Sequence, residues 1–226
     1  MIKTLACALC LPLLLTGCGG VFDSKIAAPQ TYVLRLPPAG APASEARFGT
    51  VLVQRPETSP GLESDRIALL RTDRRFDLYS ASRWAAPAPD VVESVIVDAL
   101  RATGSYAAIF DDSSPFAPRY DLRCTLRRFE ADYTVGEGTA GGAGAPTVFV
   151  ALDCTLGRHR DRALLGSFTA QGSARAAEDR LNSVVAAFET ATATAVTEVT
   201  RATASAILDK DETARSGDAA KSSPAQ

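Results

Sequence analysis

The sequence predicts an α+β fold: a single domain in which a mostly antiparallel sheet packs two main helices on one face. Many short segments alternate between apolar and polar residues, which is typical of strands with one buried face. Two longer segments instead repeat apolar residues at steps of three and four, the period of a helix. About 209 residues follow a predicted leader of residues 1–17, enough for one sizeable core over residues 31–208.

The predicted strands follow one another along most of the domain. Each is rich in β-branched or alternating apolar residues and is bounded by proline, glycine, serine or aspartate. A turn at 72–74 joins two of them as an antiparallel hairpin. We expect strands at residues 32–36, 48–55, 66–71, 75–84, 105–112, 119–133, 147–158 and 163–174.

The first helix is predicted to begin at Asp90, just after two prolines. Glu93 stands three residues later, so the pair has the pattern of a capping box. Gly104 is typical of the position just beyond a helix end. The apolar residues in between fall on one helical face: Val92, Val95, Ile96 and Ala99.

A second, longer helix is predicted over residues 179–208, about 40 Å long at 1.5 Å per residue. After Phe188 its apolar stripe consists mainly of alanine and threonine, which lets another surface approach closely. That stripe either packs across the sheet of the same domain or forms a surface for a partner. Residues 209–226 are charged and small without an apolar period, so we expect a disordered tail there.

The N-terminus has the pattern of a lipoprotein signal peptide. Lys3 precedes an apolar run of about 11 residues, too short for a bilayer-spanning helix of about 20. The segment Leu15-Thr16-Gly17-Cys18 resembles the bacterial lipobox, in which a leucine and two small residues precede a lipidated cysteine. The resemblance implies cleavage before Cys18 and acyl chains on its sulfur and amine. An ordinary signal peptide with a chance cysteine is the alternative.

Residues 18–30 are expected to form a lipidated N-terminus and a short tether. A single acyl chain holds a protein only marginally, since each buried CH₂ contributes about 0.8 kcal/mol, but two or three chains hold it firmly. Gly19 follows the cysteine where an aspartate would retain such a lipoprotein at the inner membrane. The lipobox resemblance therefore implies the periplasmic face of the outer membrane.

Composition argues against a nucleic-acid partner. The chain has 24 basic and 26 acidic residues, and removal of Lys3 with the leader leaves a net charge of −3. Nucleic-acid binding needs a basic excess, which is missing. Membrane attachment is accordingly expected through the acyl chains rather than through charge.

No pattern in the sequence indicates catalysis. Gly136, Gly138 and Gly141 have the spacing of a dinucleotide-binding loop, but that loop must lead into a helix and a strand is predicted here. His159 is the only histidine and lies among arginines in a predicted turn, a poor setting for a metal ligand. We therefore expect no catalytic residues, no cofactor and no metal site, and we expect that the protein is not an enzyme.

Two cysteines remain for a disulfide after the leader is removed and Cys18 is lipidated. If the strands at 119–133 and 147–158 form a hairpin centred on residue 139, Cys124 lies opposite Cys154. Both thiols then share the apolar face in an oxidising compartment. A disulfide and two buried free thiols are both compatible with this arrangement.

A set of segments carries a wider resemblance. It consists of the lipobox, TYVLRLPP, the stretch from TVLVQRPETSPGLESDRIALL to SRWAAPAPDVV, YDLRCTLRRFEADY and the alanine-rich last helix. Together they resemble the ABC-type transport auxiliary lipoproteins, the family that includes paraquat-inducible protein C. The resemblance covers about residues 31–208, and its most specific parts are Asp65–Ile67, Leu78-Tyr79, Arg83-Trp84, Tyr120–Leu122 and Phe129-Glu130.

The resemblance implies a non-enzymatic subunit of a lipid transport system. Such systems pair an ABC transporter or another membrane partner with a mammalian-cell-entry-domain protein that forms a tunnel across the periplasm. This chain would dock the far end of that tunnel at the outer membrane. A periplasmic lipid-binding module and an envelope-assembly lipoprotein are the alternatives, and a homo-oligomer is compatible with each of them.

Overall fold

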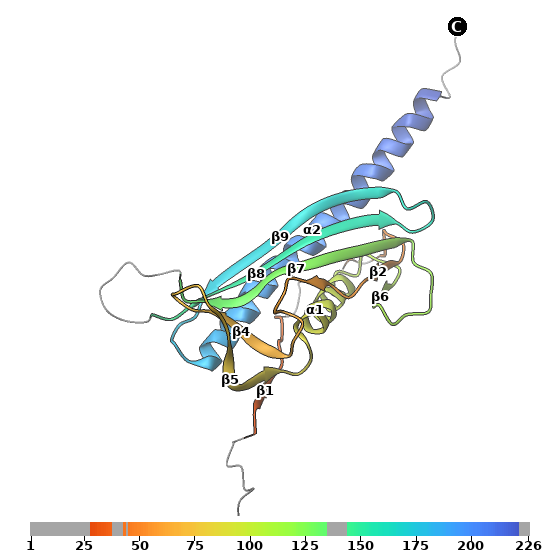
Figure 1. The fold of residues 1–226 in the computed structure, drawn as a ribbon. Helices are drawn as coiled ribbons and strands as arrows, with labels where there is room; N and C mark the ends of the chain where they lie inside the picture. Colours follow the sequence, from red (N-terminus) through yellow and green to blue (C-terminus); the bar gives the residue numbers. More distant parts are fainter. Residues whose placement is uncertain (1–27, 38–42, 44, 135–143, 222–226) are drawn as a thin grey trace, which may run out of the picture.

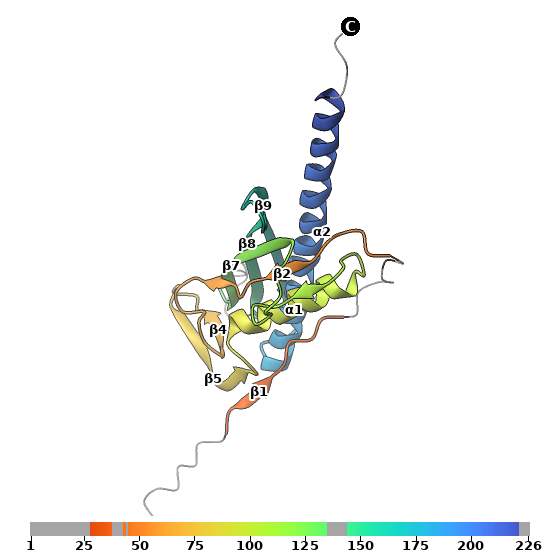
Figure 2. The same cartoon turned by 90° about the vertical axis from the view of Figure 1, so that its right-hand side faces the viewer.

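The computed structural model describes residues 28–37, 43, 45–134 and 144–221, with side chains as far as residue 210. The predicted leader, Cys18 and the glycine-rich loop at 136–141 lie outside the described residues. Figure 1 shows a curved sheet with both helices behind it, and Figure 2 shows the same arrangement from the side.

The described part of the chain contains two helices and nine strands. The last three strands are long and form a meander. Six shorter strands precede it, with one helix between the fifth and the sixth. The elements are β1 Gln30–Tyr32, β2 Val51–Val53, β3 Glu57–Thr58, β4 Arg66–Leu70, β5 Phe76–Trp84, α1 Ala88–Ala102, β6 Ile109–Phe110, β7 Tyr120–Asp132, β8 Thr147–Arg158, β9 Leu164–Arg175 and α2 Leu181–Lys221.

The predicted α+β class is confirmed, and strand β7 is the centre of the sheet. On one side β7 pairs with β8, which pairs with β9, both antiparallel. On its other side β7 pairs in parallel with β2, β3 and β4. Most paired residues are antiparallel, including those that join β4 to β5. Strands β2, β3 and β4 run parallel to β7 because α1 carries the chain back before β7 begins.

Both predicted ends of the first strand were wrong. The first strand is β1 at Gln30–Tyr32, paired in parallel with β5, rather than 32–36. After Tyr32 the chain leaves the sheet because Leu34 buries its side chain in the core, while the backbone N–H of Arg35 donates to Glu189 on α2. Tertiary packing here outweighs the strand propensity of the segment.

The predicted capping box at the start of α1 was wrong. The helix begins at Ala88 with Pro87 at the N-cap, and no side chain caps it. Pro89 in the first turn provides a backbone angle that already suits a helix, and Asp90 and Glu93 take other partners. The predicted end is confirmed, since Gly104 follows the C-cap residue with a φ of 63°.

Helix α2 is longer than predicted. It runs for 41 residues, about 60 Å, and its last turns project beyond the sheet (Figure 1). The prediction of a disordered tail was wrong for residues 209–221 and cannot be compared beyond them. This segment contains four good helix formers, Lys210, Glu212, Ala214 and Arg215, and it extends a helix that packing has already nucleated.

The face of α2 that carries alanine and threonine packs on the sheet of its own domain, as one of the two interpretations predicted. Phe188 and Ala195 are fully buried, and Gly172 on β9 brings the backbone of β9 against α2. At the centre of the core, Trp84 of β5 lies 5.1 Å from Phe188 and 5.7 Å from Phe129 of β7, measured between ring centroids. These three aromatic rings tie both halves of the sheet to α2.

Candidate functional site

The two ends of the described chain lie at opposite ends of the molecule. Strand β1 is at the edge of the sheet. The projecting part of α2 leaves from the other end in both views (Figures 1 and 2). A membrane anchor upstream of β1 would therefore leave the end of α2 and the β8–β9 turn facing away from the membrane.

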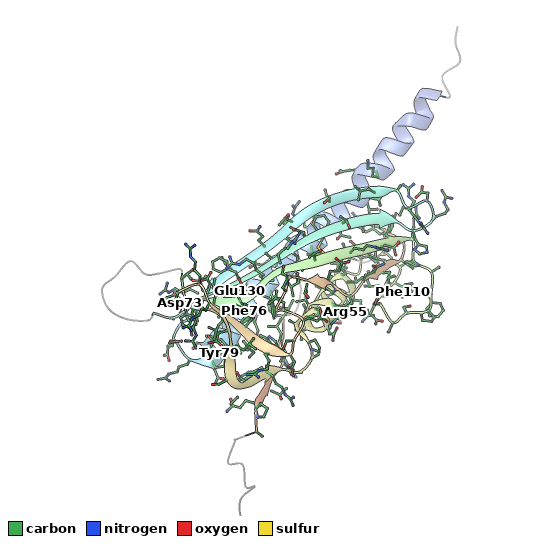
Figure 3. The ribbon with its side chains drawn as sticks, viewed as in Figure 1. Arg55, Asp73, Phe76, Tyr79, Phe110 and Glu130 are labelled. Carbon is green, nitrogen blue, oxygen red and sulfur yellow. A yellow bond between two sulfur atoms is a disulfide. The ribbon has the colours of Figure 1, made fainter. Side chains whose placement is uncertain are left out.

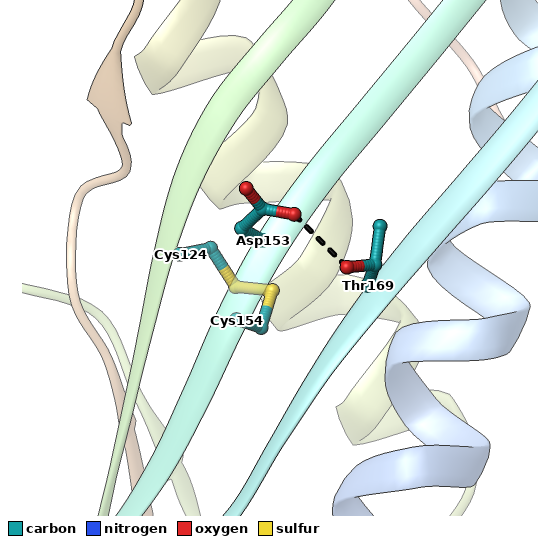
Figure 4. The surroundings of a disulfide bond; sticks show 4 residues. All are labelled: Cys124, Asp153, Cys154 and Thr169. Carbon is teal, nitrogen blue, oxygen red and sulfur yellow. Dashed lines mark hydrogen bonds between the residues drawn. A yellow bond between two sulfur atoms is a disulfide. The ribbon is translucent and has the colours of Figure 1, made fainter.

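Cys124 on β7 and Cys154 on β8 form a disulfide in the structure (Figure 4). The two residues are directly paired in the register that the hairpin geometry predicts. Both side chains are buried on the face that the helices cover. Beside them Asp153 points to the opposite, solvent-facing side, where it accepts hydrogen bonds from Arg127 and Thr169.

A groove of about 850 Å³ lies on the solvent-facing side of the sheet, next to the β8–β9 turn. Strands β2, β7 and β8 form its floor, and the turn forms its wall. We call it the basic groove because cationic and apolar side chains dominate its lining: Arg123, Arg158, His159, Arg160, Arg162 and Leu164.

The charges of the basic groove are only partly neutralised. Arg158 pairs with Asp161 at 3.0 Å, and His159 pairs with Asp121 at 2.9 Å. Among the residues that the structure describes, Arg123, Arg160 and Arg162 form no ion pair. These three guanidinium groups are therefore available to an external anion.

Arg162 holds a backbone conformation that is unusual for its residue type. Its φ is 55°, in the left-handed region that costs a side-chain-bearing residue roughly 1–2 kcal/mol. The turn nevertheless carries arginine rather than glycine there. Arg162 is one of the residues that line the basic groove.

A second groove of about 470 Å³ lies beside α1 and is lined mainly by carboxylates. Arg55 bridges Asp90 and Glu63 and holds the pKa of Glu63 below its usual range (Figure 3). Glu93 accepts the backbone N–H of Asp112 at 2.9 Å. The polar groups of this groove thus largely satisfy one another, and their role is to fix the connection between α1 and β6.

A tyrosine pair joins β5, β7 and the start of α2. The hydroxyl groups of Tyr79 and Tyr133 lie 2.8 Å apart, and Tyr133 donates to Asp179 (Figure 3). Burial, followed by these hydrogen bonds, raises the pKa of Tyr133 above its usual value. Both hydroxyl groups therefore stay protonated at neutral pH and act as a structural link.

One buried charge cluster lies at the end of β7. Glu130 and Asp132 are almost inaccessible to solvent, and Arg128 donates to both at 2.6 and 2.8 Å. The guanidinium group also stacks 4.1 Å above the ring centroid of Phe149. Each buried carboxylate therefore has a partner, and neither is left as an uncompensated buried charge.

The described residues contain neither a group of metal ligands nor a helix that could span a membrane. No group of three or more His, Cys, Asp and Glu side chains there is arranged to hold a metal ion. None of the helices in this part combines sufficient length with sufficient apolar character to cross a bilayer. His159 lies at the end of β8 with its ring half exposed, as expected for a turn residue.

A comparison with protein families gives a match that covers most of the domain. Residues 32–200 match the family described as the ABC-type transport auxiliary lipoprotein component. The chain belongs to this family. The family is a class of transport component rather than a class of enzyme, and lipid attachment to the cell envelope fits its description.

Solved structures share the fold. A Xanthomonas campestris protein of the family model DUF330 is 25% identical, with a TM-score of 0.67 over 81% of this chain and 99% of that one. An uncharacterised protein of known structure is 14% identical, with a TM-score of 0.58 over 77% of this chain and 98% of its own. No curated protein gives a significant match.

The basic groove is the feature that sequence reasoning missed. The arginines at 123 and 158–162 belong to two segments that alternate regularly, and such charges usually cover a solvated strand face. The β7–β8 hairpin, which pairs Arg123 with Thr155 and Tyr120 with Arg158, and the β8–β9 turn bring them together. Strand β2 completes the floor through its parallel pairing with β7, which joins residues nearly 70 positions apart. The density of arginine in the segment GRHRDR is the one signal that could have drawn attention to it.

Proposed function

We propose that this chain is a periplasmic lipoprotein anchored in the outer membrane that docks the far end of a mammalian-cell-entry/ABC-type lipid transport system. The observation that carries the proposal is the family match over residues 32–200. The segment Leu15–Cys18 supports it, because a lipidated Cys18 supplies an anchor to a chain whose described helices do not cross a membrane.

The geometry favours a positional mechanism. The 12 residues from Cys18 to Pro29 can span at most about 40 Å, so the β1 edge of the domain stays near the membrane. Helix α2 then carries its last turns away from the membrane, toward the periplasm. The acyl chains fix one end of the protein, and the rigid domain presents the other end to the tunnel.

The rigidity that such a role needs has identifiable sources. The disulfide between Cys124 and Cys154 joins the two longest neighbouring strands, and the Trp84–Phe129–Phe188 cluster joins them to α2. A docking surface carried by this frame keeps a constant distance from the anchor. In this mechanism no side chain performs chemistry on the transported lipid.

Site-specific photocrosslinking in the intact envelope tests the docking role. A photoreactive residue at Lys210, near the projecting end of α2, is expected to crosslink to a mammalian-cell-entry-domain protein. The matched control at Glu178, an exposed position before the start of α2, is expected not to crosslink to it. Failure of Lys210 and of further positions on the projecting turns to capture such a protein would contradict the docking role.

The anchor has a separate test. Intact-mass analysis of the mature protein is expected to show an N-terminal Cys18 with its acyl chains, whereas Cys18→Ala leaves an unmodified chain. Fractionation then distinguishes the two membranes, since the lipidated protein should sediment with the outer membrane. Stoichiometric phospholipid within the folded domain would instead support the alternative of a lipid-binding module.

A further inference from the structure

We propose that the basic groove binds a phosphate group, carried either by an anionic lipid or by a free phosphate compound. Its ligands would be the guanidinium groups of Arg123, Arg160 and Arg162. The inference does not depend on the docking role, because it concerns the purified protein in the absence of any partner.

Charge is the first argument. Three guanidinium groups line one groove without an acidic partner among the described residues. Of the nearby carboxylates, Asp161 pairs with Arg158 and Asp121 lies within hydrogen-bond distance of His159 Nδ1. Like charges that share a small concave surface repel one another, and a bound anion removes this repulsion. The planar guanidinium group presents paired donors that match the oxygen atoms of a phosphate.

Shape is the second argument. The groove has a volume of about 850 Å³, within the range of small-molecule sites rather than of flat protein interfaces. Gly157 contributes only backbone to the lining, so a ligand can approach the sheet closely. A concave site of this size favours a compact anionic headgroup over the broad acidic surface of a protein.

The apolar rim is the third argument and points to a lipid as the source of the phosphate. Leu164 is 62% exposed at the edge of the groove, and Leu52 of β2 also lines it. An exposed leucine beside three unpaired guanidinium groups suits a ligand that carries its phosphate next to a hydrocarbon chain. A free phosphate compound would use the arginines and leave both leucines without a role.

Isothermal titration calorimetry on the full-length lipidated protein in a neutral detergent tests the proposal. The ligands are dihexanoyl phosphatidylglycerol and inorganic phosphate, each corrected by titration into empty micelles. The test variant is Arg160→Gln/Arg162→Gln. The control is Arg75→Gln/Arg180→Gln, which removes the same charge from exposed positions outside the groove. Circular dichroism verifies that both variants are folded.

The expected result is binding that weakens at least about tenfold in the test variant and stays unchanged in the control variant. Tighter binding of the phosphatidylglycerol than of inorganic phosphate identifies a lipid as the source, and equal binding identifies a free phosphate compound. Absence of binding for both ligands overturns the proposal. So does an equal loss in both variants, which would indicate a general effect of net charge.

Discussion

A Cβ atom placed on Gly172 of β9 would lie 2.0 Å from the carbonyl oxygen of Ala191 on α2. The strand and the helix therefore meet backbone to backbone at this point. About four turns further along, the same helix meets β9 again at Gly166, where an added Cβ would lie 2.9 Å from that of Ala206. The two glycines thus set how closely α2 packs on the sheet.

Gly172→Ala is expected to lower the free energy of unfolding by about 2–3 kcal/mol, because the added methyl group has to displace α2. Gly157→Ala is the matched control, since its nearest contact would be an unstrained 3.7 Å. Urea unfolding of both variants, followed by circular dichroism, measures the difference. Equal stability of the two variants would show that α2 is not held against β9 in this way.

Removal of the disulfide is expected to destabilise the domain. The bond closes a loop with a sequence separation of 30 residues, so Cys124→Ala/Cys154→Ala should cost about 3–4 kcal/mol of unfolding free energy. Thiol counting under non-reducing conditions gives the independent check. The unfolded mature protein should show no free thiol, and two reactive thiols per chain would contradict the bond.

The partly buried Tyr133 and the buried Tyr106 should respond differently to loss of the hydroxyl group. Tyr133→Phe removes the donor to Asp179 and is expected to cost about 1 kcal/mol. The hydroxyl of Tyr106 has no hydrogen-bond partner among the described residues, so Tyr106→Phe should leave stability unchanged or raise it by up to about 1 kcal/mol. Denaturant unfolding of the two variants measures the contrast, and a larger loss from Tyr106→Phe would contradict it.

Alkaline pH should weaken the fold through Tyr133. Its pKa is raised in the folded protein, so the folded state binds the phenol proton more tightly than the unfolded chain does. This contribution is fully present below the unfolded pKa of about 10 and is lost as the pH rises toward the folded pKa. Unfolding free energies measured across this range should fall less steeply for Tyr133→Phe than for the unchanged protein. An identical slope would contradict the assignment.

The features of the fold that depend on a repeating pattern within one strand or helix could be predicted from the sequence. Alternation in β7 and β8 placed Cys124 opposite Cys154, and the helical period located the packed face of α2 around Phe188. Each of these patterns is local, because it depends on residues that follow one another in one element. The predicted helix end before Gly104 is local in the same sense.

The parallel pairings and the basic groove were not accessible in this way. Strand β2 has only three residues, and nothing in Val51–Val53 indicates that its partner is β7. The β7–β8 hairpin and the β8–β9 turn place Arg123 and Arg160 in one lining, but the groove is completed only by Leu52 of β2 and by Gln54 just after it, through a pairing that the sequence does not indicate. The lipid anchor at Cys18 remains a prediction from the sequence motif alone.

Strand β1 has a mechanical consequence. If Cys18 is lipidated as proposed, any pull between the membrane and the periplasm enters the folded domain at Gln30–Tyr32, which runs parallel to the last residues of β5. Parallel strands under such a load slide along one another, so several hydrogen bonds resist together instead of opening one by one. Strand β5 ends at Trp84 in the aromatic cluster, and tension on the tether is thereby transmitted directly into the most tightly packed part of the protein.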